Sequence, residues 1–232
     1  MATQADLDRE VDALIAELAA EKSDIKLIAR QIKWSGISDT RLFDNVASDL
    51  LENYKSRNGT DGLEYSSWQV QVLAFSGQEK YLSTIVTVLR GTNRGKLKRH
   101  AESALRVLPD FARWNPVIAA GVSDVPSVDI PRQRVMNMLR ADSPQLVHAG
   151  ASIAYNSYLQ DAAIIEIVRA QLQSRYTNIG SDAELADAVA WLCKVLGQSG
   201  DPIHIPLLLE VEEHSQGSVK RWARAAIDQL TS

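Results

Sequence analysis

Apolar residues recur along this chain every three or four positions, which is the spacing of one face of an α-helix. A clear example is the series Tyr81, Leu82, Ile85, Val88 and Leu89. Glycines and Asp-Pro pairs separate the successive apolar stretches, and these residues commonly end helices. No stretch alternates apolar and polar residues with a period of two, so the pattern predicts no strands.

The periodic stretches fall into six pairs of helices. The pairs are expected at residues 4–34, 39–76, 79–108, 129–157, 161–197 and 201–230. A pair of about 40 residues cannot bury its apolar stripe alone, so neighbouring pairs should stack their stripes into one continuous core. We therefore predict an all-α fold in which 1–232 form a single elongated domain.

The two halves of the chain resemble each other. The segments SSWQVQVLAFSG and VAWLCKVLGQSG align Trp68 with Trp191 at an offset of 123 residues. The segments GKLKRHAESALRVL and GSVKRWARAAIDQL align Leu108 with Leu230 at an offset of 122 residues. This repetition predicts an internal duplication, and the matched tryptophans, which lie among apolar neighbours, are expected to fill the core between repeats.

The boundary between the halves is marked by proline. Four of the seven prolines lie in 109–131 (PDFARWNPVIAAGVSDVPSVDIP), and none precedes this segment. Proline interrupts helices and favours turns. We expect a first half at 1–108, a joint at 109–131 and a second half at 129–232.

The second helices of the third and sixth pairs share the order apolar, basic, x, x, Ala, x, x, Ala, apolar. The residues that fit are Leu97, Lys98, Ala101, Ala104 and Leu105, and then Val219, Lys220, Ala223, Ala226 and Ile227. This order resembles HEAT-type repeats, including the HEAT-like variant of phycobilin lyases. The resemblance implies a right-handed α-solenoid, or α-α superhelix, of about six HEAT-like helix pairs. It also implies that the first helices form an outer layer and the second helices an inner, concave layer.

Candidate partner-binding residues lie on two of the expected inner helices. Basic residues concentrate at 90–106 (RGTNRGKLKRHAESALR), and the corresponding end of the chain adds a tryptophan among further basic residues. Such groups suit an acidic or phosphorylated protein segment. The candidates are Lys98, Arg99, Arg106, Lys220, Arg221, Trp222 and Arg224.

Each candidate also has a purely structural interpretation. Lys98 and Lys220 occupy the basic position that commonly bridges neighbouring HEAT repeats, as the resemblance implies. The other charges would solvate a helix face. Trp222 is either an interface anchor or a side chain that packs against the end of the last helix.

The sequence predicts no catalytic residue, no cofactor and no metal site. Residues 91–96 (GTNRGK) depart from a phosphate-binding loop in their spacing, and no histidine stands in a metal-binding motif. Cys193 lies between apolar residues and is interpreted as a small core residue, and Ser199 lacks the strand that precedes a nucleophile elbow.

Charge and length restrict the partners. The 232 residues include 25 Lys and Arg against 29 Asp and Glu, a net charge of −4, which makes nucleic acid an unlikely partner because such binding depends on neutralised phosphates. No apolar run approaches the length of a membrane span. Residues 1–24 carry acidic residues where a secretory signal needs a basic start. We expect a cytoplasmic protein by default, or an exported one if Met1 is not the natural start.

Two functional hypotheses follow. The preferred one is a non-catalytic protein- or peptide-binding scaffold that presents the concave surface of its inner helices. The alternative is an enzyme or enzyme subunit on a HEAT-like fold, either a bilin-lyase-like subunit or a protein like the alkylated-base DNA glycosylases. The net charge of −4 and the pair Trp114–Asn115, in place of Trp-Asp, weigh against the glycosylase. The oligomeric state and the identity of the partner stay open.

Overall fold

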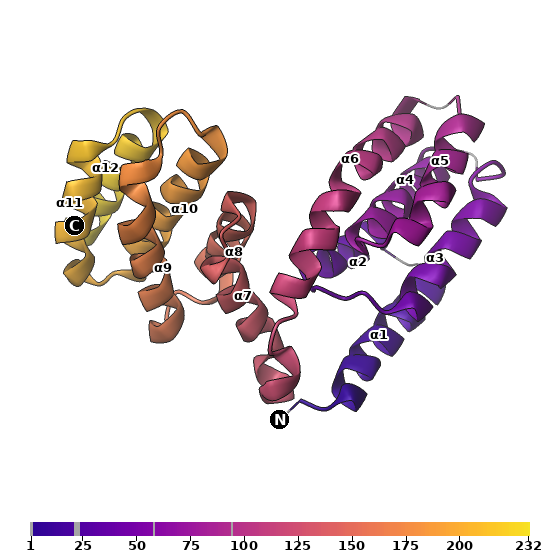
Figure 1. Cartoon of the computed structure of the whole chain (residues 1–232), viewed down its shortest axis with the longest axis horizontal. Coiled ribbons are helices and arrows are strands. Elements are labelled where there is room, and N and C mark those ends of the chain that lie inside the picture. Colours follow the sequence, from indigo (N-terminus) through magenta and orange to yellow (C-terminus); the bar gives the residue numbers. More distant parts are fainter. Residues whose placement is uncertain (1, 21–23, 58, 94) are drawn as a thin grey trace. The chain divides into compact units, whose positions relative to one another are not determined.

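The computed structural model describes residues 2–20, 24–57, 59–93 and 95–232, and helices make up most of this chain (Figure 1). Within these ranges no residue lies in a strand, so the prediction of an all-α fold is confirmed. The α-helices of the first half are α1 (Gln4–Ala19), α2 (Ile25–Lys33), α3 (Thr40–Asn53), α4 (Gly59–Phe75), α5 (Leu82–Gly91) and α6 (Gly95–Ile118). Those of the second half are α7 (Ile130–Arg140), α8 (Pro144–Ser157), α9 (Ala162–Arg175), α10 (Ala183–Ser199), α11 (Ile205–His214) and α12 (Gly217–Thr231).

Short 3-10 helices lie between several of these elements. They are η1 (Glu79–Tyr81), η2 (Val122–Asp124), η3 (Ser127–Asp129), η4 (Tyr176–Asn178) and η5 (Pro202–His204). Each of the six predicted pairs thus corresponds to two consecutive α-helices in the structure.

The starts and ends of the helices follow local chemistry. The carboxylates of Asp39, Asp161 and Asp182 accept backbone N–H hydrogen bonds at the first turns of α3, α9 and α10. These bonds satisfy donors that have no partner inside the helix. At the other end of α10, Gly200 adopts the left-handed conformation with φ of 76°, which a residue without a Cβ atom adopts at little cost.

One predicted helix end is wrong. The second helix of the third pair was expected to stop at Leu108, but α6 continues through Pro109 and Pro116 to Ile118. A proline inside a helix costs about 3 kcal/mol, because it removes one backbone hydrogen bond and clashes with the preceding turn. Packing outweighs that cost here, since Phe111 and Ile118 extend the buried stripe of the helix and are almost fully buried.

The chain divides into two compact units, Met1–Arg134 and Val135–Ser232, and the boundary falls within α7. In the first unit the second helices pack in the order α2, α4, α6, and the first helices α1, α3 and α5 pack against one another and against them. In the second unit α8, α10 and α12 pack in order, α9 packs on α10, and α11 packs on α12. We call α2, α4 and α6, and likewise α8, α10 and α12, the second-helix layer of each unit.

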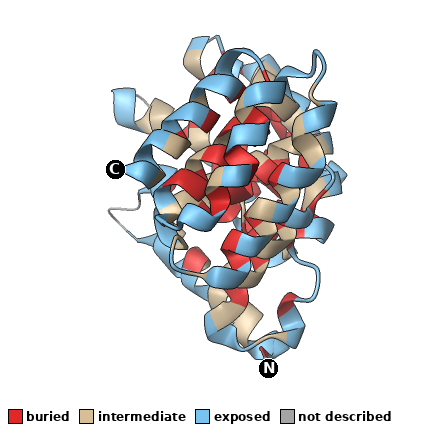
Figure 2. Cartoon of the chain, turned by 90° about the vertical axis from the view of Figure 1, so that its left-hand side faces the viewer, coloured by how far each residue is buried: buried red, intermediate tan, exposed pale blue. Residues whose placement is uncertain are grey.

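Buried residues gather where helices face each other (Figure 2). In the second-helix layers the contact faces carry small residues, and Ala101, Ala104, Ala223 and Ala226 are all buried. Small side chains allow neighbouring helices to approach closely, which brings polar and aromatic residues on the adjoining faces within reach of each other.

Among the described residues, no helix has both the length and the apolar character to cross a membrane.

Candidate functional site

The seven candidate residues all lie on the third helix of a second-helix layer. The six basic ones are exposed and Trp222 is half-buried. Those on α6 are Lys98, Arg99 and Arg106, and those on α12 are Lys220, Arg221, Trp222 and Arg224. Arg94, which belongs to the predicted basic segment, lies outside the described residues.

On α6, the side that faces α4 is defined by Lys96 and His100. Lys96 forms an ion pair with Glu64 of α4, and the ring of His100 lies 5.7 Å from the ring of Trp68 in an edge-to-face arrangement. At 3.6 residues per turn, Arg99 falls beside this contact stripe.

The helical period also places the other two basic candidates on α6. Arg106 is two turns after Arg99 and lies on the same flank, whereas Lys98 lies on the opposite side of the helix. The three α6 candidates therefore do not form one surface. On α12, Arg221 likewise falls beside Trp222, and Lys220 and Arg224 fall on the sides that face away from it.

In the second unit, α10 and α12 bring two tryptophans together around a lysine. The ammonium nitrogen of Lys194 lies 4.2 Å from the ring centroid of Trp191 and 3.9 Å from that of Trp222. The guanidinium carbon of Arg221 lies 5.7 Å from the Trp222 ring. We call Trp191, Lys194, Arg221 and Trp222 the aromatic–basic patch. Cations attract the faces of indole rings, so these contacts hold the side chains in place.

Helix α8 extends the patch on its far side. The imidazole of His148 stacks on Trp191 with ring centroids 5.4 Å apart, and Tyr155 meets the same indole edge-on at 5.9 Å. The Nδ1 atom of His148 lies 3.0 Å from a carboxylate oxygen of Asp187. Trp191 is therefore held by His148 and Tyr155 of α8 and by Lys194, which also contacts Trp222 of α12.

The two tryptophans that the duplication aligns lie between neighbouring helix pairs, as expected, since Trp68 contacts α6 and Trp191 contacts α8. Both are half-buried rather than fully buried, and Trp68 packs against the edge of the core. A signal for this was present in the sequence, because polar residues share the helix face of each tryptophan. Glu64 lies four residues before Trp68, and Asp187 lies four residues before Trp191. Gln71 lies three residues after Trp68, and Lys194 lies three residues after Trp191.

The two cations of the patch have no acidic partner among the residues that the structure describes. Within the described ranges, no carboxylate forms an ion pair with Lys194 or Arg221. By contrast, Arg134 is held by Glu10 at 2.7 Å and Arg57 by Asp49 at 2.7 Å. The patch thus carries positive charge that the chain itself does not neutralise.

A lysine of the first unit has related surroundings. The ammonium group of Lys33 lies 4.7 Å from the ring centroid of Trp34 and 6.0 Å from that of Phe75. Burial lowers the pKa of Lys33, because desolvation disfavours the charged form. Here the rings belong to one continuous aromatic cluster with Phe111 and Trp114, and the lysine covers its end.

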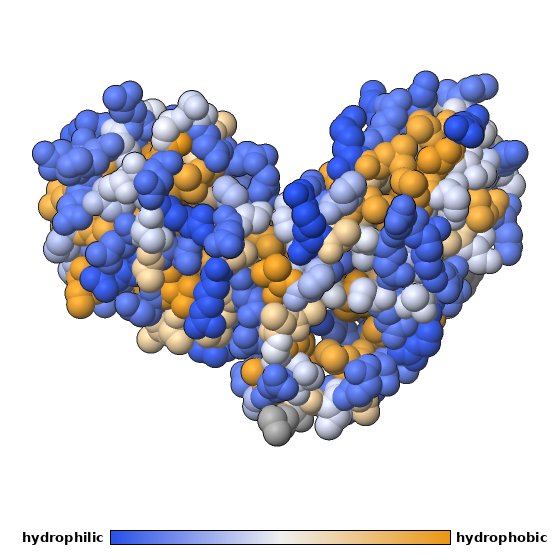
Figure 3. All heavy atoms as spheres, viewed as in Figure 1, coloured by the Kyte–Doolittle hydropathy of each residue, from blue (hydrophilic) through white to orange (hydrophobic). Residues whose placement is uncertain are grey.

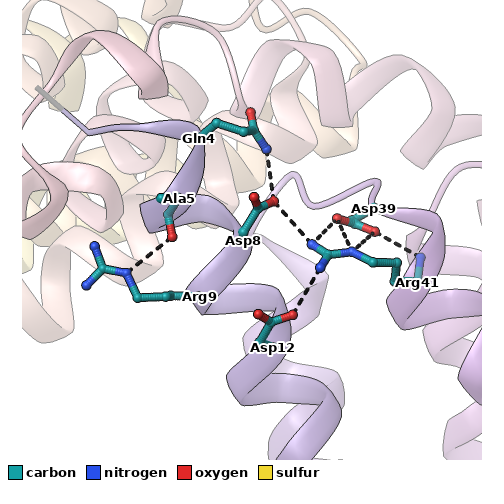
Figure 4. Close-up of polar contacts among 7 residues, drawn as sticks. All are labelled: Gln4, Ala5, Asp8, Arg9, Asp12, Asp39 and Arg41. Carbon is teal, nitrogen blue, oxygen red and sulfur yellow. Dashed lines mark hydrogen bonds and ion pairs between the residues drawn. The ribbon is translucent and has the colours of Figure 1, made fainter.

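Other clusters are accounted for by structure. Arg41 of α3 lies among three carboxylates, 3.1 Å from Asp8, 3.1 Å from Asp12 and 2.8 Å from Asp39 (Figure 4). The contacts tie α1 to α3 on an exposed surface. In the described part of the chain, no group of three or more His, Cys, Asp or Glu side chains could hold a metal ion.

A cavity of about 600 Å³ lies in the first unit between α1, α3 and α4. On its polar wall, Asp49 accepts hydrogen bonds from Arg57 at 2.7 Å and from Gln69 at 2.6 Å. The guanidinium of Arg57 also lies over the ring of Tyr65, 4.6 Å from its centroid. Asp49, Arg57 and Gln69 therefore satisfy one another.

Cys193 and Ser199, neither of which is predicted to be catalytic, are both engaged within the protein. Cys193 is fully buried, and burial raises the pKa of its thiol to about 12. The hydroxyl of Ser199 donates to the Leu196 carbonyl at 2.7 Å.

Apolar residues reach the surface in several separate places on the face seen in Figure 3. Comparisons with protein-family models, with curated proteins and with solved structures found no match.

Proposed function

We propose that the protein is a non-catalytic scaffold that binds a protein or peptide on the solvent-facing side of its second-helix layers. The observation that carries this proposal is the aromatic–basic patch, where two adjacent helices present two tryptophans and two cations without an acidic partner. Tryptophan and arginine dominate the energetics of protein interfaces, because they combine large apolar area with directed polar contacts. Such a surface is suited to a binding partner.

The architecture that we propose is a right-handed α-solenoid of about six HEAT-like helix pairs, built by internal duplication. Within each unit the second helices pack in chain order, which is the arrangement of stacked pairs. Contacts at equivalent positions of the two halves also support the duplication. Trp68 on α4 contacts the ring of His100 on α6, and Trp191 on α10 is joined to Trp222 on α12 through Lys194.

In such a solenoid the second helices would line the concave surface, and the candidate residues then separate into two groups. Arg99, Arg106, Arg221 and Trp222 lie on or beside the contact stripes and would face a partner. Lys98, Lys220 and Arg224 lie on other sides of the same helices and would have the solvating or repeat-bridging role.

The test is capture of a partner by charge-reversed variants. We expect that Arg99→Glu combined with Arg221→Glu reduces the amount of cross-linked partner recovered by mass spectrometry from a lysate of the source cells. The matched control is Lys98→Glu combined with Arg224→Glu, which makes the same charge change on the same two helices at other faces. Equal recovery with both double variants would contradict the proposed surface.

An enzyme would show itself in different measurements. Transfer of a bilin pigment by the purified protein, or a gel shift with duplex DNA that contains an abasic site, would contradict the scaffold proposal. We expect neither signal at protein concentrations that saturate partner binding.

A further inference from the structure

We infer that the aromatic–basic patch binds an acidic peptide segment. In this arrangement a partner carboxylate forms ion pairs with Lys194 and Arg221, and an apolar side chain next to it packs on the indoles of Trp191 and Trp222. The inference rests on the proposed function and adds to it the site, the unit of the chain and the chemistry of the partner.

The first step concerns the position of the Lys194 charge. Its ammonium nitrogen lies between two indole faces, 4.2 Å and 3.9 Å from their centroids. An ammonium group has three N–H donors and no acceptor, and the ring faces attract the charge without accepting a strong hydrogen bond. Because the rings fix a normally flexible side chain, less conformational entropy is lost when a carboxylate binds to it.

The second step concerns the charges around the patch. Glu184 and Asp187 share the helix face of Trp191 on α10, and the imidazole of His148 contacts Asp187 at 3.0 Å. The charges of the patch itself, on Lys194 and Arg221, are both positive, so the patch favours an anion although the whole chain has a net charge of −4.

The third step separates the two units. Lys194 aligns with Gln71 at the duplication offset of 123, and the Gln71 amide donates to the backbone carbonyl of His100 at 2.7 Å. The indole N–H of Trp68 donates to Glu64 at 3.0 Å. In the first unit the equivalents of Lys194 and Trp191 are thus hydrogen-bonded within the chain, and we therefore assign the acidic segment to the second unit.

Single-stranded nucleic acid is the competing ligand, because its bases stack on aromatic rings and its phosphates pair with cations. Such binding usually follows a long positively charged groove, and the patch contributes only Lys194 and Arg221. A short acidic peptide needs no more than this pair of cations.

The experiment is a selection of random 12-residue peptides displayed on phage against the full chain. We expect enrichment of Asp and Glu next to Trp, Phe or Leu. The most enriched peptide is then labelled with fluorescein, and its dissociation constant is measured by fluorescence anisotropy. Lys194→Glu combined with Arg221→Glu should weaken binding at least about tenfold, because two attractive charges become repulsive.

The matched control is Lys220→Glu combined with Arg224→Glu, which makes the same charge change near the patch but outside it and should leave the dissociation constant within about twofold. Circular dichroism melts verify that both variants fold. If the charge-reversed variant unfolds, Lys194→Met with Arg221→Gln, which keeps the aliphatic stems, must weaken binding in the same direction.

Three results would overturn the inference. They are a selection that yields no binding peptide or only basic ones, an affinity that the patch variants do not change, and a fluorescein-labelled dT20 oligonucleotide that binds the patch more tightly than the peptide. The scaffold proposal has a separate test, because it requires only that cross-links to a native partner map to the second helices. A partner whose cross-links map to α4 and α6 would preserve the scaffold and eliminate the acidic-segment site.

Discussion

Gly197 of α10 lies directly against Ala226 of α12, so close that a Cβ atom added at Gly197 would stand 2.7 Å from both the Cα and the Cβ of Ala226. The absence of a side chain at Gly197 allows the two helices to touch along their backbones. This approach places Trp222 within reach of Lys194, so the patch depends on the contact.

We predict that Gly197→Ala destabilises the second unit by about 2 kcal/mol, because the added methyl group meets backbone rather than a movable side chain. Urea denaturation followed by circular dichroism measures the change. Gly95→Ala is the control, since nothing lies within 4 Å of the position where its Cβ atom would stand. Equal stability of the two variants would show that α10 and α12 are not packed as closely as described.

Asn115 explains part of the stability of the extended α6. Its side-chain amide donates to the carbonyls of Phe75 at 2.9 Å and Ser76 at 3.0 Å, at the end of α4. We predict that Asn115→Ala costs about 2 to 3 kcal/mol of unfolding free energy, because buried carbonyls lose their donor. Asn156→Ala is the comparison, since Asn156 is exposed and bonds only within its own helix. A loss below about 0.5 kcal/mol for Asn115→Ala would remove this explanation.

His204 predicts a fall in stability toward acid pH. It is 3% exposed, and neither ring nitrogen has a hydrogen-bond partner. Burial lowers the pKa of His204, Arg169 adds to the lowering, and Asp201 and Glu166 oppose it. The unfolded chain therefore binds the proton more readily, so stability is complete above the ordinary pKa of about 6.5 and declines as the pH falls through it.

The measurement compares the unfolding free energy at about pH 7.5 and pH 5.5 in wild type and His204→Phe. The decline should be smaller in His204→Phe, because phenylalanine cannot take up the proton. Parallel pH profiles for wild type and His204→Phe would contradict the burial of a neutral imidazole.

Cys193 provides a probe of the folding of the second unit. Because the thiol is fully buried and its pKa is raised to about 12, we predict no reaction with iodoacetamide in the folded protein at pH 8. The thiol should react fully in urea, with a midpoint that coincides with loss of the helical signal. Rapid alkylation without urea would place Cys193 at the surface.

The sequence predicts the helix pairs well because the apolar spacing directly determines which faces are buried. It fails at the end of α6, where Pro109 was interpreted as a helix stop. The stabilising contacts come from Phe111 and Asn115 meeting the end of α4, and such contacts between distant segments leave no local pattern.

The site was predicted in part. Arg221 and Trp222 are recognisable from composition, because an aromatic side chain among basic ones is typical of interfaces. Lys194 was missed because its neighbours along the chain, Cys193 and Val195, are core residues. Its role depends on α10 and α12 being adjacent, which joins residues 28 positions apart in the sequence.

The most direct test of the binding surface uses a photo-cross-linking amino acid, p-benzoylphenylalanine, at one of two exposed positions in lysate from the source cells. One position is Arg221 on α12, and the other is Leu209 on α11, which is 50% exposed on a first helix. We expect a cross-linked partner from position 221 that excess unmodified protein competes away, and none from position 209. A partner captured from position 209 and not from position 221 would contradict the proposed binding surface.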